Sequence, residues 1–296
     1  MIETVMGGFG LLEGPVYDPD RGLLFTDATA GGVFCLAPDG RLETVVKHRT
    51  GIGGISLHID GGVIVSGRNI AYKGPDDVLT AVLLPNAPED GIIGFNDITT
   101  DAAGRIYAGS LAYRPLIPSD DPKPGRLHLI DLDGTTQVLS TGVQTTNGMG
   151  FSPDGRRLYH ADTWKNLIYA YDVRDDGRIG DREVFVDMGE GMPDGLAVAM
   201  DGSIWVATVY AGLVIVYNPD GSERTRFQFS TPMITSLCFA GEDLRDVYVV
   251  SGSEGSGRED AGTIYRLRAD APGVPVVPAR VSITRISIPD SPSRET

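Results

Sequence analysis

A turn of one kind recurs six times along the 296 residues. Each copy consists of a short apolar strand, a turn that contains Asp or Gly, and a second apolar strand, as in residues 151–159 and 198–206. Asp-Gly turns between apolar runs indicate β-hairpins, and periods of this length are typical of repeat architectures. The copies are 40 to 51 residues apart, as measured between the turn residues Asp20, Asp60, Ala103, Asp154, Asp201 and Asp243.

Most copies are followed by further strand-like sequence that ends in a second turn, such as residues 213–217 before Pro219-Asp220-Gly221. About four antiparallel strands per copy and six copies predict an all-β fold, a six-bladed β-propeller. A sandwich or barrel is the alternative, but two packed sheets do not explain six evenly spaced units. Because blades do not fold independently and no linker divides the copies, we expect a single domain over residues 1–296.

The composition limits the partners and the compartment. A net charge of −15 argues against nucleic acid or an anionic membrane as the partner, which leaves a small molecule; the oligomeric state stays open. Cys35 and Cys238 lie in apolar strand patterns, so we expect buried free thiols and no disulfide framework. The first residues contain no basic segment and no long apolar run. We therefore expect no signal peptide, no membrane span and a cytoplasmic protein.

One position in each repeat lies at nearly the same distance before its turn. Four residues lie eight positions before a turn glycine, and two more occupy the corresponding places in the first and last copies: Gly53, Asn96, Asn147 and Asp194, then Glu13 and Ser236. If the copies surround an axis, these positions face one another across it. Asn-Gly and Asp-Gly taken singly are ordinary turn dipeptides. The shared register favours a site for a hard cation, because Glu13, Asn96, Asn147 and Asp194 supply side-chain oxygens.

Such oxygens suit one divalent cation, with Ca²⁺ as the first choice and Zn²⁺, Mg²⁺ or Mn²⁺ as alternatives. A bound cation polarises a carbonyl and lowers the pKa of water, and a nearby carboxylate then takes the proton, which implies hydrolysis of an ester-like bond. The sequence contains no Gly-x-Ser-x-Gly elbow, no Walker-type loop and no paired metal-binding histidines. His160 is expected to be packed, and the glycine-rich residues 251–257 are expected to form a flexible loop.

Around the same positions the chain resembles the family of gluconolactonase, regucalcin (senescence marker protein) and luciferin-regenerating enzyme. The resemblance covers nearly the whole chain and rests on the segments Leu12-Glu13-Gly14-Pro15, Phe95-Asn96-Asp97, Thr146-Asn147-Gly148, Pro193-Asp194-Gly195 and Thr235-Ser236-Leu237. It implies a six-bladed propeller with one divalent cation in the central channel, held by Glu13, Asn147 and Asp194. It further implies that Asn96 contacts metal or substrate and that Asp194 is the general base or nucleophile. Members of the family commonly open sugar lactones.

The sequence departs from the sugar-lactonase pattern at Gly94, where those enzymes usually have an arginine, and in the loop after the third copy, where they often have an acidic residue. We therefore expect smaller or more apolar lactones to be better substrates than glucono-1,5-lactone. Arg68 is a candidate replacement for the missing arginine, although a solvent-facing arginine is the alternative.

Residues 111–125 are expected to form a lid over the channel, although a surface loop with no role is the alternative. The substrate contacts expected there come from Tyr113 and Arg114, with Leu116 beside them and Phe95 on the channel wall.

The function expected from these observations is a metal-dependent hydrolase, an enzyme that acts on a lactone or a related ester. Two alternatives stay open, because a fold does not fix a function. One is a lyase or isomerase reaction at the same site, and the other is a non-enzymatic propeller that binds calcium or another ligand.

Overall fold

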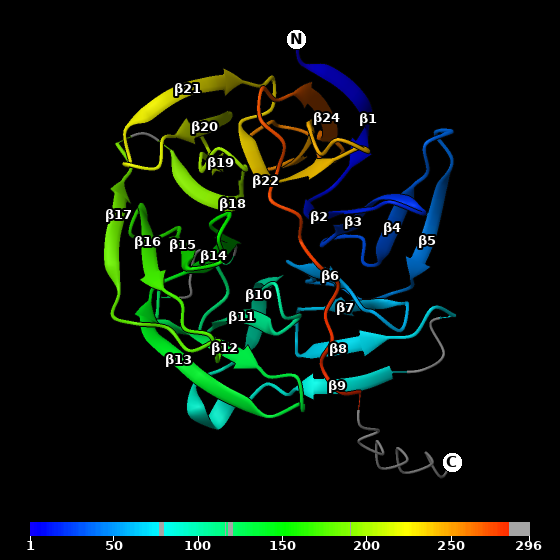
Figure 1. Cartoon of the computed structure of the whole chain (residues 1–296). Helices are drawn as coiled ribbons and strands as arrows, with labels where there is room; N and C mark the ends of the chain where they lie inside the picture. Colours follow the sequence, from blue (N-terminus) through cyan, green and yellow to red (C-terminus); the bar gives the residue numbers. More distant parts are fainter. Residues whose placement is uncertain (77–79, 116, 118–120, 190, 284–296) are drawn as a thin grey trace, which may run out of the picture.

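The computed structural model describes residues 1–76, 80–115, 117, 121–189 and 191–283. Six four-stranded antiparallel sheets surround a central axis (Figure 1), which confirms the predicted six-bladed β-propeller. Within these ranges the only helical element is a 3₁₀ turn, η1 (Pro88–Asp90). The same residues include no helix of the length and apolar character that a bilayer crossing requires.

In blades 1 to 5 the chain enters each sheet at the axis and moves outward strand by strand. Blade 1 consists of β2 (Leu12–Asp18), β3 (Gly22–Asp27), β4 (Val33–Leu36) and β5 (Leu42–Val46). Blade 2 consists of β6 (Ile55–Leu57), β7 (Val63–Val65), β8 (Ile70–Lys73) and β9 (Thr80–Leu84). Blade 3 consists of β10 (Gly94–Thr100), β11 (Ile106–Leu111), β12 (Gly125–Ile130) and β13 (Thr136–Val143).

Blade 4 consists of β14 (Thr146–Phe151), β15 (Arg157–Asp162), β16 (Leu167–Asp172) and β17 (Glu183–Asp187). Blade 5 consists of β18 (Met192–Val198), β19 (Ile204–Val209), β20 (Leu213–Tyr217) and β21 (Glu223–Gln228). Blade 6 consists of β22 (Met233–Ala240), β23 (Asp246–Gly252), β24 (Gly262–Arg268) and β1 (Glu3–Phe9). The N-terminal strand β1 pairs with β24, so both ends of the chain contribute to the last sheet and close the ring.

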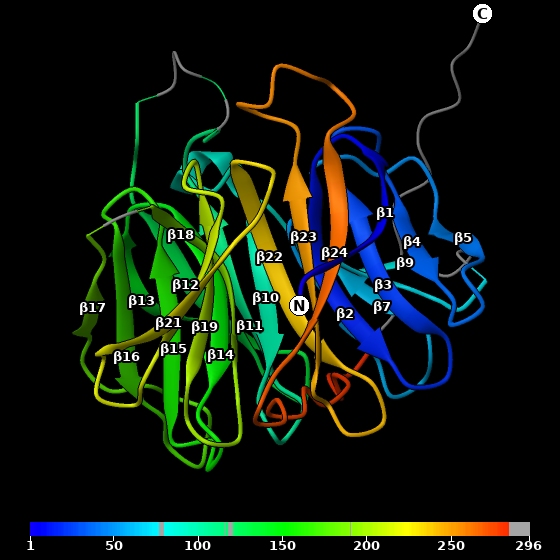
Figure 2. The same ribbon diagram turned by 90° about the horizontal axis from the view of Figure 1, so that it is seen from above.

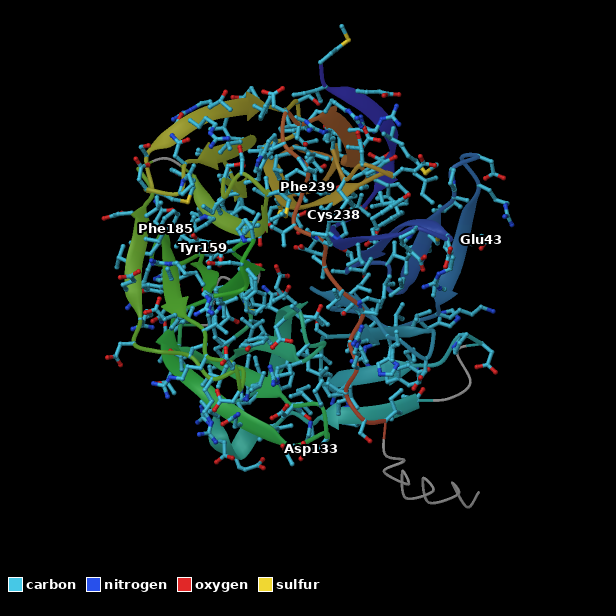
Figure 3. All side chains as sticks on the ribbon, viewed as in Figure 1. Glu43, Asp133, Tyr159, Phe185, Cys238 and Phe239 are labelled. Atoms are coloured by element: carbon cyan, nitrogen blue, oxygen red, sulfur yellow. The ribbon has the colours of Figure 1, made fainter. Side chains whose placement is uncertain are left out.

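The apolar core is divided among the junctions between blades. Each of the six junctions contains one cluster of buried side chains, because alternate residues of a strand face opposite neighbouring blades. Between blades 1 and 2, for example, Leu24 packs with Val63, whereas its neighbour Phe25 packs toward blade 6. Tyr159 and Phe185 of blade 4 lie side by side at the junction with blade 5 (Figure 3), with ring centroids 4.8 Å apart.

Three further expectations about buried residues can be compared with the structure. Both cysteines are free; Cys35 is buried, but Cys238 is only partly buried. His160 is packed as expected, with none of its surface exposed. Burial lowers the pKa of His160 to about 3, with a smaller effect from Arg182, so its ring is neutral at pH 7.

The two faces of the ring differ. The turns that contain the repeated Asp and Gly join the innermost strand of each blade to the second strand, and we call this side the turn face. The opposite side is called the site face; the loops between β11 and β12 and between β23 and β24 rise from it (Figure 2).

Residues 269–283, called here the C-terminal segment, cross the turn face (Figures 1 and 2). Backbone bonds connect this segment to four blades: Gly273 N donates to Leu244 O (2.7 Å), Val274 N to Val198 O (2.8 Å), Ala279 N to Leu57 O (2.7 Å) and Arg280 N to Gly104 O (2.9 Å).

Candidate active site

A β-bulge interrupts the innermost strand of blade 1 at the predicted site. Glu13 pairs with Thr26 and Val16 pairs with Leu24, so β2 has one residue more than β3 between these pairs. A bulge changes the direction of the side chains in it and is common next to functional sites. The same one-residue excess occurs in β10, β14 and β18, within the pairs that enclose Asn96, Asn147 and Asp194.

Glycines after the site residues let the innermost strands approach closely. A Cβ on Gly148 would overlap the backbone nitrogen of Leu196, and one on Gly195 would overlap the Ser236 side chain. The predicted site positions are therefore brought together at the narrow centre of the ring. At Gly53 the contact is direct, because a Cβ there would overlap Oδ1 of Asn96.

Hydrogen bonds fix the two amide side chains. Asn96 Nδ2 donates to the carbonyl oxygen of Thr146 (3.0 Å), and Asn147 Nδ2 donates to Oγ1 of Thr163 (3.0 Å). These bonds use the nitrogen end of each amide, so the oxygen end remains as an acceptor for a cation or substrate. The Asn147 side chain also lies close enough to the Asp194 carboxylate to lower its pKa, so these two predicted ligands lie near each other.

The two predicted carboxylate ligands lie in an environment that disfavours their charge. Burial, with added repulsion from Asp194 and Asp97, raises the pKa of Glu13 well above its ordinary value. Burial and Asp97 likewise raise the pKa of Asp194, and the nearby Asn147 side chain offsets only part of this effect. The structure thus brings Glu13, Asn147 and Asp194 together, with Asn96 bonded to the residue that precedes Asn147.

Asp97 is a third carboxylate at this site, and the sequence analysis did not single it out. It is 9% exposed, its Oδ1 has no hydrogen-bond partner among the described residues, and burial raises its pKa to about 7. In blades 1, 2, 4 and 5 the equivalent position after the site residue is glycine. A carboxylate at a position otherwise occupied by glycine is the signal that could have identified it.

These donors fit a divalent cation. Two carboxylates and two amide oxygens are hard ligands, and a cation would favour the ionised forms that burial now disfavours. Among the described residues, no three or more His, Cys, Asp or Glu side chains are arranged to hold a metal ion. The predicted set includes only Glu13 and Asp194 of these types, with amides as the remaining ligands.

Two of the predicted substrate contacts lie in blades 2 and 3. Phe95 is 2% exposed and packs in the cluster between these blades, with its ring edge against His128 at 5.6 Å between centroids. Arg68 is exposed in the loop between β7 and β8. Arg49 holds that loop, because its guanidinium donates to the carbonyl oxygens of Ser66 (2.8 Å) and Asn69 (2.7 Å). A substrate contact by Phe95 or Arg68 stays a prediction.

The residues expected to form a lid fall in the loop between β11 and β12. Tyr113 is buried there, and its hydroxyl contacts Oγ1 of Thr145. Arg114 is exposed. Leu116 and residues 118–120 lie outside the described residues, so the lid and the contacts of Tyr113 and Arg114 with substrate stay predictions.

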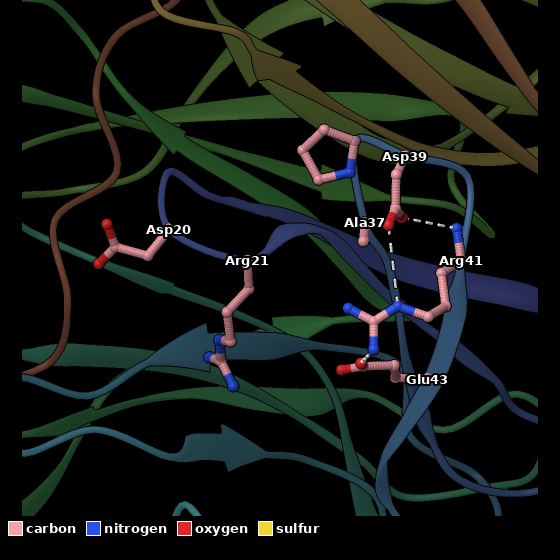
Figure 4. A pocket seen from close by; sticks show the side chains of 7 residues that line it. Asp20, Arg21, Ala37, Asp39, Arg41 and Glu43 are labelled. Carbon is pink, nitrogen blue, oxygen red and sulfur yellow. Dashed lines mark hydrogen bonds and ion pairs between the residues drawn. The ribbon is translucent and has the colours of Figure 1, made fainter.

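Two hollows in the protein surface lie away from these residues. One, of about 360 Å³, is on the turn face of blade 1 (Figure 4), where Arg41 pairs with Asp39 and Glu43. The other, of about 260 Å³, lies between blades 1 and 6 and includes Tyr17 and Tyr248 in its lining. Neither includes any of the predicted site residues.

Comparison with known proteins adds to this geometry. Residues 11–253 match the family described as the SMP-30/Gluconolactonase/LRE-like region. The chain is 34% identical over 280 residues to pentonolactonase XacC of Haloferax volcanii. The aligned region covers 89% of this chain and 92% of that protein. The chain is 32% identical over 273 residues to 6-deoxy-6-sulfogluconolactonase of Pseudomonas putida, and the aligned region covers 88% of this chain and 92% of that protein.

Solved structures agree in fold. A luciferin-regenerating enzyme superposes with a TM-score of 0.86 at 20% identity, over 95% of this chain and 99% of that one. The calcium-binding protein regucalcin of Agrobacterium tumefaciens strain C58 superposes with a TM-score of 0.83 at 21% identity, over 95% of this chain and 97% of that one. Since the family match extends over most of the sequence, the chain belongs to the SMP-30/gluconolactonase/LRE-like family.

Proposed function

We propose that this protein is a metal-dependent lactonase. The observation that supports the proposal is that Glu13, Asn147 and Asp194 lie at or within the bulges of three innermost strands, where the charge of Asp194 raises the pKa of Glu13 and Asn96 bonds to the residue before Asn147. Membership of a family that includes two named sugar lactonases supports lactone hydrolysis in particular.

Glu13, Asn147 and Asp194 would hold the cation, with Asn96 in or next to its ligand shell. Ca²⁺ is our first choice, since hard oxygen donors suit it and one structural neighbour is described as a calcium-binding protein. When bound, the cation supplies polarisation of the lactone carbonyl and a lower pKa for water.

Asp194 is the general base of the proposed reaction. Water adds to the carbonyl carbon while the Asp194 carboxylate accepts its proton. The ring carbon–oxygen bond then breaks, and Asp194 returns the proton to the ring oxygen, which becomes a hydroxyl group of the same molecule. The product is the open-chain hydroxy acid. The amides of Asn96 and Asn147 orient the reactants, because their nitrogen ends are already bonded to protein.

Two expectations differ about the class of lactone that is the substrate. Both named relatives act on sugar lactones, whereas Gly94 led us to expect smaller or more apolar lactones. A panel of hydroxylated and unsubstituted lactones, assayed by acid release with each divalent cation and with chelator, tests the proposal. We expect turnover that disappears with chelator and returns with added cation. Turnover that is insensitive to chelator, or no turnover of any lactone by the metal-loaded protein, would reject it.

A non-enzymatic calcium-binding protein is the second candidate. The structural neighbour described as a calcium-binding protein favours it. Calcium binding by calorimetry, lost in Glu13→Gln, together with no turnover across the panel would decide for this alternative.

A further inference from the structure

Two exposed aromatic side chains occupy equivalent positions next to the candidate active site. Thr146 precedes Asn147 and pairs with Asp162, and Trp164 follows two residues later. In blade 5, Pro193 precedes Asp194 and pairs with Thr208, and Tyr210 again follows two residues later. Both large side chains remain exposed on the site face, Trp164 by 56% and Tyr210 by 54%.

Trp164 is connected to the site through its neighbour in sequence. Thr163 accepts the hydrogen bond from Asn147 Nδ2, and its own backbone N donates to Thr145 O (3.1 Å). The turn that presents Trp164 is therefore fixed relative to a predicted metal ligand.

Tyr210 is held in a backbone conformation that side chains rarely adopt. Its φ is +66°, in the left-handed region, which is unfavourable for a residue other than glycine. Burial raises the pKa of Tyr210, and the nearby charges of Glu254 and Asp194 raise it further. Tyr210 and Glu254 therefore lie near each other on the site face, and Asp194 lies within electrostatic range of Tyr210.

Glu254 belongs to the glycine-rich loop between β23 and β24. Its neighbour Ser253 ties this loop to blade 1, because Ser253 N donates to Gly10 O (3.0 Å) and Oγ donates to the same oxygen (2.9 Å). Oγ also accepts from the backbone N of Ala261 (2.8 Å). These bonds fix the backbone next to Glu254 close to Gly10, two residues before β2 begins.

We propose that Trp164, Tyr210 and Glu254 form the substrate-recognition wall of this channel and select a polyhydroxylated lactone ring. The proposal rests on the lactonase function above and names the groups that recognise its substrate. Aromatic faces pack against the apolar C–H face of a sugar ring, while a carboxylate accepts hydrogen bonds from hydroxyl groups and a tyrosine hydroxyl donates or accepts them.

This wall supplies polar groups for substrate hydroxyls in place of the arginine that is absent at Gly94. The expected preference for apolar lactones considered only the side of the channel that lies next to Asn96. Blades 4 to 6 provide an acceptor, a hydroxyl and two aromatic rings from another direction. Polar groups that require a partner disfavour the analogue without hydroxyls, so we expect glucono-1,5-lactone to be preferred over δ-valerolactone.

Kinetics of two variants on these two lactones test the wall. Glu254→Gln should raise KM for glucono-1,5-lactone about 10-fold and Tyr210→Phe about 5-fold, as expected for loss of a charged and a neutral hydrogen bond. Neither should change kcat/KM for δ-valerolactone by more than about 2-fold, because that ring has no hydroxyl to bind. Glu259→Gln, at an exposed position of the same loop, is the matched control and should leave both substrates unchanged.

Binding of the product class provides a readout without turnover. Trp164 is exposed and Trp205 is 6% exposed, so sodium gluconate should change the fluorescence of wild type but not of Trp164→Phe. Sodium hexanoate, which has the carboxylate but no hydroxyls, should bind more weakly. Equal responses to both acids, or a response that persists in Trp164→Phe, would overturn the proposal.

The outcomes for function and recognition are distinct. Lactone turnover with equal effects of the variants on both substrates would overturn the recognition wall and leave the lactonase function intact. Gluconate binding that requires Trp164 and Glu254, without turnover of any lactone, would support the wall and reject the lactonase function.

Discussion

The same dipeptide serves two purposes at the two ends of one hairpin. Asp194-Gly195 lies in the bulge of β18 on the axis, and Asp201-Gly202 forms the turn that follows β18. Asp194 is buried and its pKa is raised, first by burial. Asp201 experiences burial too, but its bonds with Ser203 and Arg224 outweigh it and lower its pKa.

The contrast extends around the ring. On the turn face, hydrogen bonds from Ser152, Ser222 and Arg268 lower the pKa values of Asp154, Asp220 and Asp243 respectively. On the axis, Glu13, Asp97 and Asp194 all have raised values. The turn carboxylates accept hydrogen bonds from the fold itself, whereas burial disfavours the charge of the axial carboxylates, an effect that a bound cation or a proton would offset. Unfavourable environments of this kind cluster at functional sites.

The largest expected effect comes from one substitution made at both ends of this hairpin. Asp194→Asn keeps the size and one oxygen but removes the base, so we expect kcat to fall by about 10²-fold or more with the fold retained. Asp201→Asn is the matched control and should keep kcat within about 2-fold, because its side chain bonds only to the turn and Arg224. Near-normal turnover by Asp194→Asn at saturating cation would remove Asp194 from the mechanism.

The C-terminal segment on the turn face allows a second comparison, between a buried and an exposed valine. Val281 is 1% exposed in the cluster between blades 2 and 3, whereas Val276 in the same segment is 62% exposed. Val281→Ala should lower the free energy of unfolding by about 2 kcal/mol through lost burial and a residual cavity. Val276→Ala should change it by less than about 0.5 kcal/mol.

Urea denaturation measures both variants, and kcat per folded molecule should stay at the wild-type value. A fall in kcat for Val281→Ala without a loss of stability would show that the turn face affects catalysis. The turn face and the site face would then not be independent.

Much of this arrangement could be predicted from local patterns. Asp-Gly turns and apolar runs specify hairpins, and the constant spacing of Asn96, Asn147 and Asp194 from their turns predicted that they would converge. Because each blade repeats one geometry, an equal offset from a turn becomes an equal position in the innermost strand; that these residues hold a cation stays a prediction.

Features that depend on contacts between distant segments could not be predicted in this way. The ring of Phe95 packs in the core beside His128, and several of its neighbours there come from distant strands; its expected contact with substrate stays a prediction. The protonation state of Asp97 depends on the blades that bury its side chain. The path of the C-terminal segment is fixed by backbone bonds to residues such as Leu57 and Val198, which leave no pattern in the sequence.

The last prediction concerns stability against pH in the cation-free protein. In the unfolded chain Asp97 should have the ordinary aspartate pKa of about 3.9, and in the folded protein its pKa is about 7. Between these values the folded state binds more protons than the unfolded state, so the free energy of unfolding should fall as pH rises and level off above about pH 7. We expect Asp97→Asn to remove a decrease of about 2 kcal/mol between pH 5 and pH 7.

Urea denaturation in chelator at pH 5, 6, 7 and 8 measures this slope. Asp154→Asn is the turn-face control: its pKa is lowered by the hydrogen bond from Ser152, so its contribution is lost only as pH falls below the ordinary aspartate value, and the slope above pH 5 should not change. Saturating Ca²⁺ should flatten the wild-type slope, because a cation stabilises the ionised carboxylates that burial penalises. Equal slopes for wild type and Asp97→Asn would show that the axial carboxylates are not held in the unfavourable state that distinguishes them from those of the turns.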